Sequence, residues 1–141
     1  MTNKIVLRGK IAVKGLAEGS ALVTNESIHF LGGVDYKTGV ITIRNHELEG
    51  KSIAKKILIF PAQIGSTGEP MGLYFLIRTG KNPRAILCST RGQMPVVSSM
   101  VAGTPYLYNL DKDPVKIIKT GDHVKIDANR GIVEIIKRNE I

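Results

Sequence analysis

The sequence predicts an α/β fold in which many short, mixed strands combine with two or three helices, and three observations support this prediction. First, an apolar, β-branched run at Ile57–Phe60 enters a turn-rich stretch, and the apolar segment 71–77 beyond it has the length of a helix. Second, another apolar run at Pro83–Cys88 completes a strand–helix–strand pattern typical of a βαβ crossover. Third, residues 123–136 place Asn and Gly in turn positions between two apolar runs, which indicates a hairpin.

The chain before the central run predicts short strands separated by turns rich in glycine and polar residues. The predicted strands are Lys4–Val13 with a bend at Gly9, Ala21–Val23, Ile28–Leu31 and Val40–Ile43. The predicted turns and loops are Gly15–Gly19, Gly32–Gly39 and Arg44–Gly50.

The chain after the central crossover continues in the same style. A short helix at Pro95–Val101, a strand at Pro105–Tyr108 and a polar turn at Asp111–Pro114 precede the final hairpin. No repeat, low-complexity segment or linker divides the chain, so we expect one domain spanning 1–141.

Composition limits the classes of protein to which this chain can belong. With 141 residues, 43% of them hydrophobic and 23% charged, it has the composition of an ordinary soluble globular domain. No apolar run approaches the ~20 residues that span a bilayer, and the first residues lack the apolar core of a signal peptide. We therefore expect a cytoplasmic protein.

The single cysteine, Cys88, excludes an intramolecular disulfide and any cysteine-built zinc or iron–sulfur site within this chain. Because it lies in the apolar run Ala85–Cys88, we expect a buried structural thiol. The three histidines lack the spacing of a metal motif, so the sequence predicts no metal site.

The net charge of +8 raises the alternative of a basic nucleic-acid-binding module. However, the basic residues form no cluster along the chain, and aromatic residues make up only 5% of it, which provides few stacking surfaces. A positive surface suits a small anionic substrate or an acidic partner equally well.

The stretch Pro61–Pro70, which contains Gly65-Ser66-Thr67, places backbone N–H groups and hydroxyls before a predicted helix. A helix N-terminus carries partial positive charge and unpaired donors, so it can bind an anion or stabilise an alkoxide. The spacing of Ser66 and Glu69 also fits a capping box, in which Ser66 only caps the helix. The local sequence leaves both interpretations open.

Two polar loops, Gly32–Gly39 and Arg44–Gly50, precede the central strand and carry Asp35 and His46. Functional groups concentrate on such loops. The alternative is a turn-forming aspartate and a solvated loop histidine, and the residues alone do not decide between them.

Taken together, several motifs resemble the small subunit of the aconitase X family, a swivelling domain of the aconitase C-terminal type. The motifs are Gly19-Ser-Ala-Leu-Val-Thr24, Gly32-Gly-Val-Asp-Tyr-Lys-Thr-Gly39, His46-Glu-Leu-Glu-Gly-Lys-Ser52, Gly65-Ser-Thr67 and Thr120-Gly-Asp-His-Val-Lys-Ile-Asp-Ala128. Their order and spacing cover nearly the whole chain, so the resemblance implies a single swivel-type β/β/α domain.

The resemblance also implies an activity. Archaeal subunits of this kind belong to a hydro-lyase that dehydrates (R)-5-phosphomevalonate to trans-anhydromevalonate 5-phosphate, and bacterial relatives dehydrate cis-3-hydroxy-L-proline. In the family, the serine of the central turn is the base, which corresponds to Ser66. The resemblance further implies a larger partner subunit that carries an iron–sulfur cluster, without which this chain is inactive.

By the same resemblance, the residues expected to bind substrate or face the large subunit are Gly65, Thr67, Gly32, Gly33, Asp35 and His46. Two positions depart from the pattern common in aconitase-type turns: Ile64 replaces an arginine, and Thr67 replaces a second serine. Thr67 retains a hydroxyl, whereas Ile64 removes a group that would bind a substrate anion.

Overall fold

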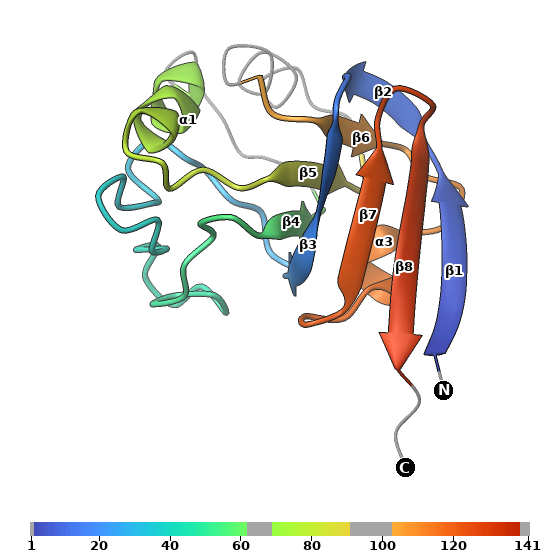
Figure 1. Ribbon diagram of the computed structural model, residues 1–141. Helices are drawn as coiled ribbons and strands as arrows, with labels where there is room; N and C mark the ends of the chain where they lie inside the picture. The colour runs from blue at the N-terminus through green and yellow to red at the C-terminus, as the bar shows by residue number, and fades with distance from the viewer. Residues whose placement is uncertain (1, 62–68, 91–102, 139–141) are drawn as a thin grey trace.

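Eight strands form one strongly curled sheet, accompanied by two helices, in the computed structural model, which describes residues 2–61, 69–90 and 103–138 (Figure 1). The strands are β1 (Thr2–Arg8), β2 (Lys10–Val13), β3 (Leu16–Val23), β4 (Ile57–Phe60), β5 (Ala85–Cys88), β6 (Tyr106–Tyr108), β7 (His123–Asp127) and β8 (Ile132–Arg138). The helices are α1 (Glu69–Arg78) and α3 (Pro114–Ile117).

The strand order β1-β8-β7-β3-β4-β5-β6-β2 combines two kinds of pairing. On one side, β1, β8, β7 and the first half of β3 are antiparallel. On the other side, the second half of β3, β4, β5 and β6 are parallel, and β2 pairs antiparallel to β6. In Figure 1, the parallel strands cross the antiparallel ones at a steep angle.

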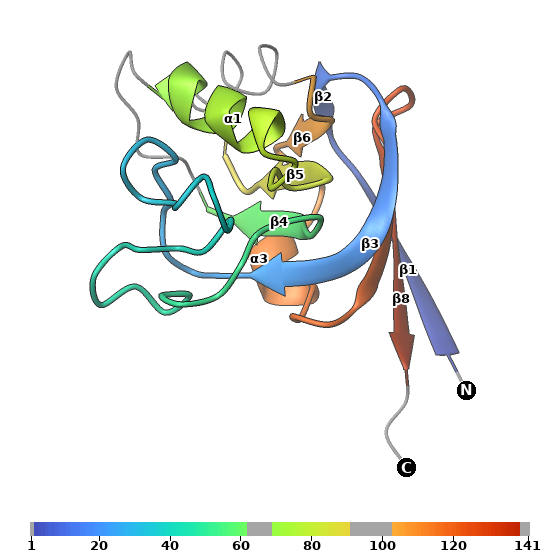
Figure 2. The same cartoon turned by 60° about the vertical axis from the view of Figure 1, so that its left-hand side comes forward.

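Two stretches of chain pass from one half of the sheet to the other. Strand β3 pairs with β7 through Leu16–Ser20 and then with β4 through Ala21–Val23, and Figure 2 shows the strong bend this requires. The β1–β2 stretch changes its partner from β8 to β6 at Gly9, where an added Cβ would lie 2.9 Å from Leu110 Cγ. Because both crossings join the same two halves, the sheet curls toward a barrel.

The parallel strands are buried on both faces, so their side chains divide between two cores. In β4, Ile57 and Ile59 face a core enclosed by the antiparallel strands and α3, whereas Leu58 and Phe60 face the opposite core. This second core is closed by α1, through Leu73 and Leu76, and by apolar side chains of the loop 24–56. Those loop side chains are Ile28, Phe30, Val34, Ile41, Leu48 and Ile53.

Several predicted elements are confirmed. The apolar run forms β4, and the segment after it forms α1, which ends at Arg78 before Gly80 in the left-handed conformation (φ 73°). The next run forms β5, parallel to β4, as a βαβ crossover requires. The C-terminal stretch forms the β7–β8 hairpin, and the predicted bend falls at Gly9 between β1 and β2.

Other predicted elements are wrong. Gly15–Gly19 is not a turn, because β3 runs through Gly19. Neither Ile28–Leu31 nor Val40–Ile43 forms a strand; the second contributes only isolated bridges, Val34↔Ile41 and Val40↔Ser52. The helix expected at Pro95–Val101 lies outside the described residues. Helix α3, which was not predicted, begins at Pro114 after its cap Asp113.

Candidate functional site

The carboxyl ends of the parallel strands and the N-terminal end of α1 meet at one edge of the molecule. In Figure 2, the arrowheads of β3, β4 and β5 point toward this edge, and α1 begins beside it. Ligands of open sheets with parallel strands generally bind beyond the carboxyl ends of the strands. We therefore define the candidate site as this edge, from Thr24 after β3 to Ser89 and Thr90 after β5.

Main-chain hydrogen bonds hold the segments that leave these strands close together. The Thr24 N–H donates to Ile59 O at 3.0 Å, and the Thr90 N–H donates to Pro61 O at 3.1 Å. The Ser89 hydroxyl donates to Asp113 Oδ1 at 2.7 Å, and the same carboxylate oxygen caps α3 by accepting from Val115 N–H. The edge thus collects hydroxyl and carboxylate groups from β3, β5 and the start of α3.

The loop 28–39 lies along α1, and glycine makes this contact possible. A Cβ on Gly72 would lie 2.6 Å from both Phe30 C and Leu31 N, so helix and loop touch through their backbones. Farther along the helix, the Tyr36 ring packs on Phe75 at 5.5 Å between centroids, and the Thr79 hydroxyl donates to Tyr36 O. The first predicted loop is therefore fixed beside the helix that follows the central turn.

Gly32 and Gly33 lie in this loop and differ in their surroundings. Gly32 has φ 82° and nothing within 4 Å of an added Cβ, so its backbone conformation alone favours glycine. A Cβ on Gly33 would lie 2.1 Å from His29 O, so this position has no room for a side chain. Gly32 is exposed and Gly33 is buried, and the binding role expected of both stays a prediction.

Asp35 organises its own turn. Its Oδ1 accepts the Lys37 N–H at 2.8 Å, and its carbonyl oxygen accepts the Gly39 N–H at 2.7 Å. The Asp35 N–H donates to Val40 O at 2.8 Å, which closes the hairpin. These contacts show how the turn is built, and a contact of Asp35 with substrate or the large subunit stays a prediction.

His46 is 8% exposed, and both of its ring nitrogens bind loop backbone. Nδ1 accepts the Leu48 N–H at 3.0 Å, and Nε2 lies 3.1 Å from Ser27 O. Because a carbonyl oxygen only accepts, Nε2 is the donor in its contact with Ser27, and Glu26 Oε2 lies 3.6 Å from Nδ1 on the other side of the ring. The ring thus links Ser27 to the backbone at Leu48 within the loop 24–56. Its predicted place facing the large subunit stays a prediction.

A pair that the sequence did not single out, Thr24 and Glu47, lies at the same edge. Glu47 Oε1 accepts hydrogen bonds from the Thr24 hydroxyl and from the Asn25 N–H, the latter at 2.6 Å. These two bonds, led by the one from Thr24, hold the pKa of Glu47 below its ordinary value of 4.5. The only signal in the sequence was that both residues fall within the motifs that carry the family resemblance.

The predicted base, Ser66, and its neighbours Gly65 and Thr67 lie outside the described residues. The structure places the two elements that flank them: β4 ends at Phe60, and α1 begins at Glu69. The strand and the helix on either side of the predicted turn are therefore present in the expected order.

An iron–sulfur cluster does not fit the donor set of this chain. Burial raises the pKa of the Cys88 thiol to about 12, which disfavours the thiolate that would ligate iron. Cys88 is also the only cysteine in the sequence, whereas such clusters are held by several thiolates. Within the described ranges, no group of three His, Cys, Asp or Glu side chains is arranged to hold a metal ion.

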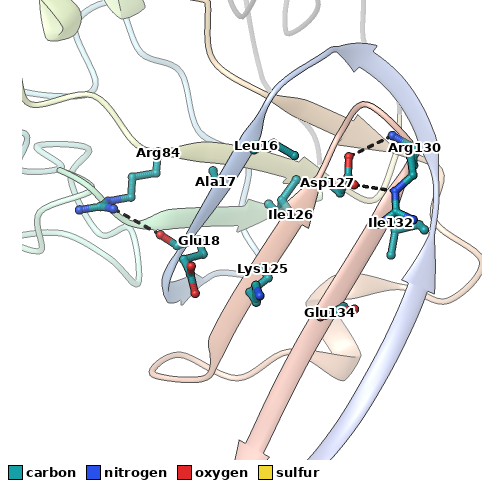
Figure 3. A pocket seen from close by; sticks show the side chains of 10 residues that line it. All are labelled: Leu16, Ala17, Glu18, Arg84, Lys125, Ile126, Asp127, Arg130, Ile132 and Glu134. Atoms are coloured by element: carbon teal, nitrogen blue, oxygen red, sulfur yellow. Dashed lines mark hydrogen bonds and ion pairs between the residues drawn. The ribbon is translucent and has the colours of Figure 1, made fainter.

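A pocket of about 540 Å³ lies elsewhere, on the outer face of β3, β7 and β8 (Figure 3). Two of its charged groups pair with each other: Arg130 Nε binds Asp127 Oδ2 at 2.7 Å and lowers the pKa of that carboxyl group. Arg84, which precedes β5, donates to the backbone oxygen of Glu18 at 3.4 Å. The pocket opens near the amino end of β5, opposite the candidate site.

Comparison with known proteins decides the family. The model of the aconitase X swivel domain matches residues 6–135. This chain belongs to the aconitase X swivel-domain family. The match covers both cores and the candidate edge, so the family assignment rests on nearly the entire fold.

Several named relatives match over almost their full length. The phosphomevalonate dehydratase small subunit of Thermococcus gammatolerans is 39% identical over 130 residues, covering 92% of this chain and 97% of the relative. The protein of the same name from Pyrococcus furiosus is 37% identical over 135 residues, covering 96% and 98%.

Solved structures agree with the fold. The crystal structure of Thermococcus kodakaraensis aconitase X in its holo-form matches with a TM-score of 0.87 and 37% identity, covering 93% of this chain and 98% of that one. The solution NMR structure of a UPF0107 protein matches with a TM-score of 0.84 and 36% identity. The predicted swivel-type fold is therefore confirmed. No helix within the described ranges is long and apolar enough to cross a membrane.

Proposed function

We propose that this swivel domain is the small subunit of a hydro-lyase that dehydrates (R)-5-phosphomevalonate to trans-anhydromevalonate 5-phosphate. The observation that carries the proposal is the set of relatives named phosphomevalonate dehydratase small subunit, which match at 35–39% identity along nearly the full length of both chains. A small subunit implies a larger partner, and we propose that the two form a heterodimer in the cytoplasm.

The reaction removes a hydroxyl group and a proton from adjacent carbons, so it needs a base and an acid that assists departure of the hydroxyl. In this proposal Ser66 is the base and takes the proton. Its position supports the role, because Ser66 stands three residues before the first residue of α1. The N-terminal N–H groups of that ten-residue helix can stabilise a serine alkoxide.

The remaining predicted residues would shape the site around Ser66. Gly65 and Thr67 flank the base in sequence, and the loop of Gly32, Gly33 and Asp35 is held against α1. The positive net charge of the chain, +8, favours an anionic substrate. Because this chain does not fit an iron–sulfur cluster, we assign the cluster to the large subunit.

Reconstitution tests the proposal. The chain is purified alone and together with the aconitase X large subunit of the same organism, with the cluster kept intact under anaerobic conditions, and each preparation is given (R)-5-phosphomevalonate or cis-3-hydroxy-L-proline. We expect dehydration of phosphomevalonate by the pair and no turnover by the isolated chain. Turnover by the isolated chain, or a preference of the pair for hydroxyproline, would contradict the proposal.

A further inference from the structure

An exposed apolar surface lies on the outer side of α1. Within the described ranges, seven large hydrophobic side chains are exposed, and four of them gather on α1 and the loop beside it. They are Leu31 (42% exposed), Tyr36 (47%), Met71 (48%) and Tyr74 (38%). We call these four residues the α1 patch. The other three are distributed over β1, β2 and β3.

The patch is continuous because helix and loop are packed together. Met71 and Tyr74 are three residues apart and so lie on one face of the helix. The adjacent stripe contains Gly72, which meets the backbone at Leu31, and Phe75, which packs on Tyr36. Figure 2 shows α1 on the outer surface with this loop beside it.

Its composition and charge resemble those of a protein interface. Tyrosine, methionine and arginine are enriched at the centres of interfaces, where a few aromatic anchors supply most of the affinity. Arg78 belongs to the patch border: its guanidinium carbon lies 5.9 Å from the centroid of the Tyr74 ring, and Nη1 donates to the Tyr74 hydroxyl at 3.1 Å. Lys37 is exposed next to Tyr36, so the border is basic.

We propose that the α1 patch is the surface on which the large subunit docks, through an apolar depression bordered by carboxylates. This inference rests on the proposed function, because it takes the large subunit as the partner. It follows from position: Met71 lies in the first turn of α1, beside the edge at which the shared site would form. A partner that completes that site must cover the surface around the start of α1.

The docking surface is tested by measuring the affinity of purified variants for the aconitase X large subunit from the same organism. Tyr74→Asp and Tyr36→Asp each place a carboxylate in the patch, and we expect each to weaken pairing by about thirtyfold or more, the usual effect of losing an interface anchor. Tyr74→Phe keeps the ring, and Leu16→Asp alters the most exposed of the seven residues, which lies on β3; both variants should pair as the wild type does.

Two further readouts separate docking from folding and from chemistry. Tyr36 and Tyr74 both lie at the surface, so the isolated variants should keep the wild-type thermal midpoint; if Tyr74→Asp lowers it, Tyr74→Ala replaces that variant in the affinity measurement. At saturating large subunit, turnover by Tyr74→Asp should return to within about threefold of wild type, because the patch contributes to binding and not to the reaction.

The possible outcomes are distinct. Pairing that is weakened by Leu16→Asp but not by the tyrosine variants overturns the inference, as does a wild-type chain that does not bind the large subunit. Self-association of the isolated chain that Tyr74→Asp abolishes, with large-subunit affinity unchanged, would identify a second copy as the occupant and also overturn it. If the pair forms through the patch but does not dehydrate phosphomevalonate, docking stands and the proposed function fails.

Discussion

The two faces of the parallel strands are covered in different ways. One core is closed by regular elements, the antiparallel strands and α3, and includes Ile59 and Leu87. The other is closed by α1 and the irregular loop 24–56, whose form depends on side-chain-to-backbone bonds such as those of His46 and Glu47. The first face gives the fold its framework, whereas the second carries the loop residues of the candidate site that the structure describes, among them Asp35 and His46. Variants can therefore show whether substitutions on one face change mainly stability and substitutions on the other change mainly turnover.

The largest expected effect concerns Ser66, which precedes α1 in the sequence. Ser66→Ala should lower turnover of the assembled enzyme by about 10²–10⁴, because it removes a positioned base, while folding and pairing persist. Thermal midpoint, pairing and turnover are measured on one preparation. If Ser66 is only a helix cap, the variant loses about 1 kcal/mol of stability with turnover nearly intact.

Thr67→Ala is the matched control, since it removes a neighbouring hydroxyl and should reduce turnover much less. Near-normal turnover in both variants would refute a catalytic role for this turn.

On the framework side, Ile59→Ala should lower the free energy of unfolding by about 2–5 kcal/mol, because a fully buried side chain of β4 leaves a cavity. Denaturant unfolding of the isolated chain measures this loss. Turnover per folded molecule should stay close to wild type. If Ile59→Ala instead lowers turnover strongly and leaves stability unchanged, stability and function are not separated between the two faces.

Gly72→Ala sharpens the comparison because two effects oppose each other. In an exposed helix the change would stabilise by up to about 1 kcal/mol. Here the added Cβ would lie 2.6 Å from Leu31 N, so we expect a net loss of about 1–3 kcal/mol as the loop shifts away from α1. Thermal unfolding shows whether Gly72→Ala raises or lowers the stability of the protein. A gain in stability would show that helix and loop are not packed as described.

The smallest effect concerns pH and the Thr24–Glu47 pair. Because the folded-state pKa of Glu47 lies below its ordinary value of 4.5, its contribution to stability is complete above about pH 4.5 and is lost as the pH falls through the folded-state pKa. Glu47→Gln should remove this part of the acid sensitivity, and Thr24→Val should reduce it. Thermal midpoints of the wild type and both variants at pH 7 and below pH 4.5 measure the loss of stability in acid. If neither variant changes that loss, the Thr24–Glu47 pair is not its source.

The sequence was sufficient where local signals agree with the fold. Ile57–Phe60, α1 and the β7–β8 hairpin each combine an apolar run with turn residues at its ends, and all three are confirmed. It failed where distant partners decide the structure. Gly19 was interpreted as part of a turn, but pairing with Val124 of β7 keeps it in β3.

In the loop and the candidate site, too, the structure depends on partners that are distant in the sequence. Ile28 and Phe30 resemble a strand in composition, yet they are buried in a core shared with α1 and the parallel strands, so their burial does not require them to form a strand. The Asp113-Pro114 signal was interpreted as a turn, although the same dipeptide caps and begins α3. Thr24 and Glu47 meet only because the intervening loop folds back on itself, which no local pattern records.

The closure of the sheet has a consequence for synthesis of the protein. Of the eight strands, β1 is made before the others and its partner β8 after them, with Thr2 opposite Arg138. The unit β4–α1–β5 consists of local contacts and can assemble while the rest of the chain is still being translated. Until β8 arrives, β1 has an open edge that could pair with another chain, and Lys4 and Arg8 place positive charge along it. Because like charges repel, we expect Lys4 and Arg8 to oppose edge-to-edge pairing of nascent chains until β8 is made.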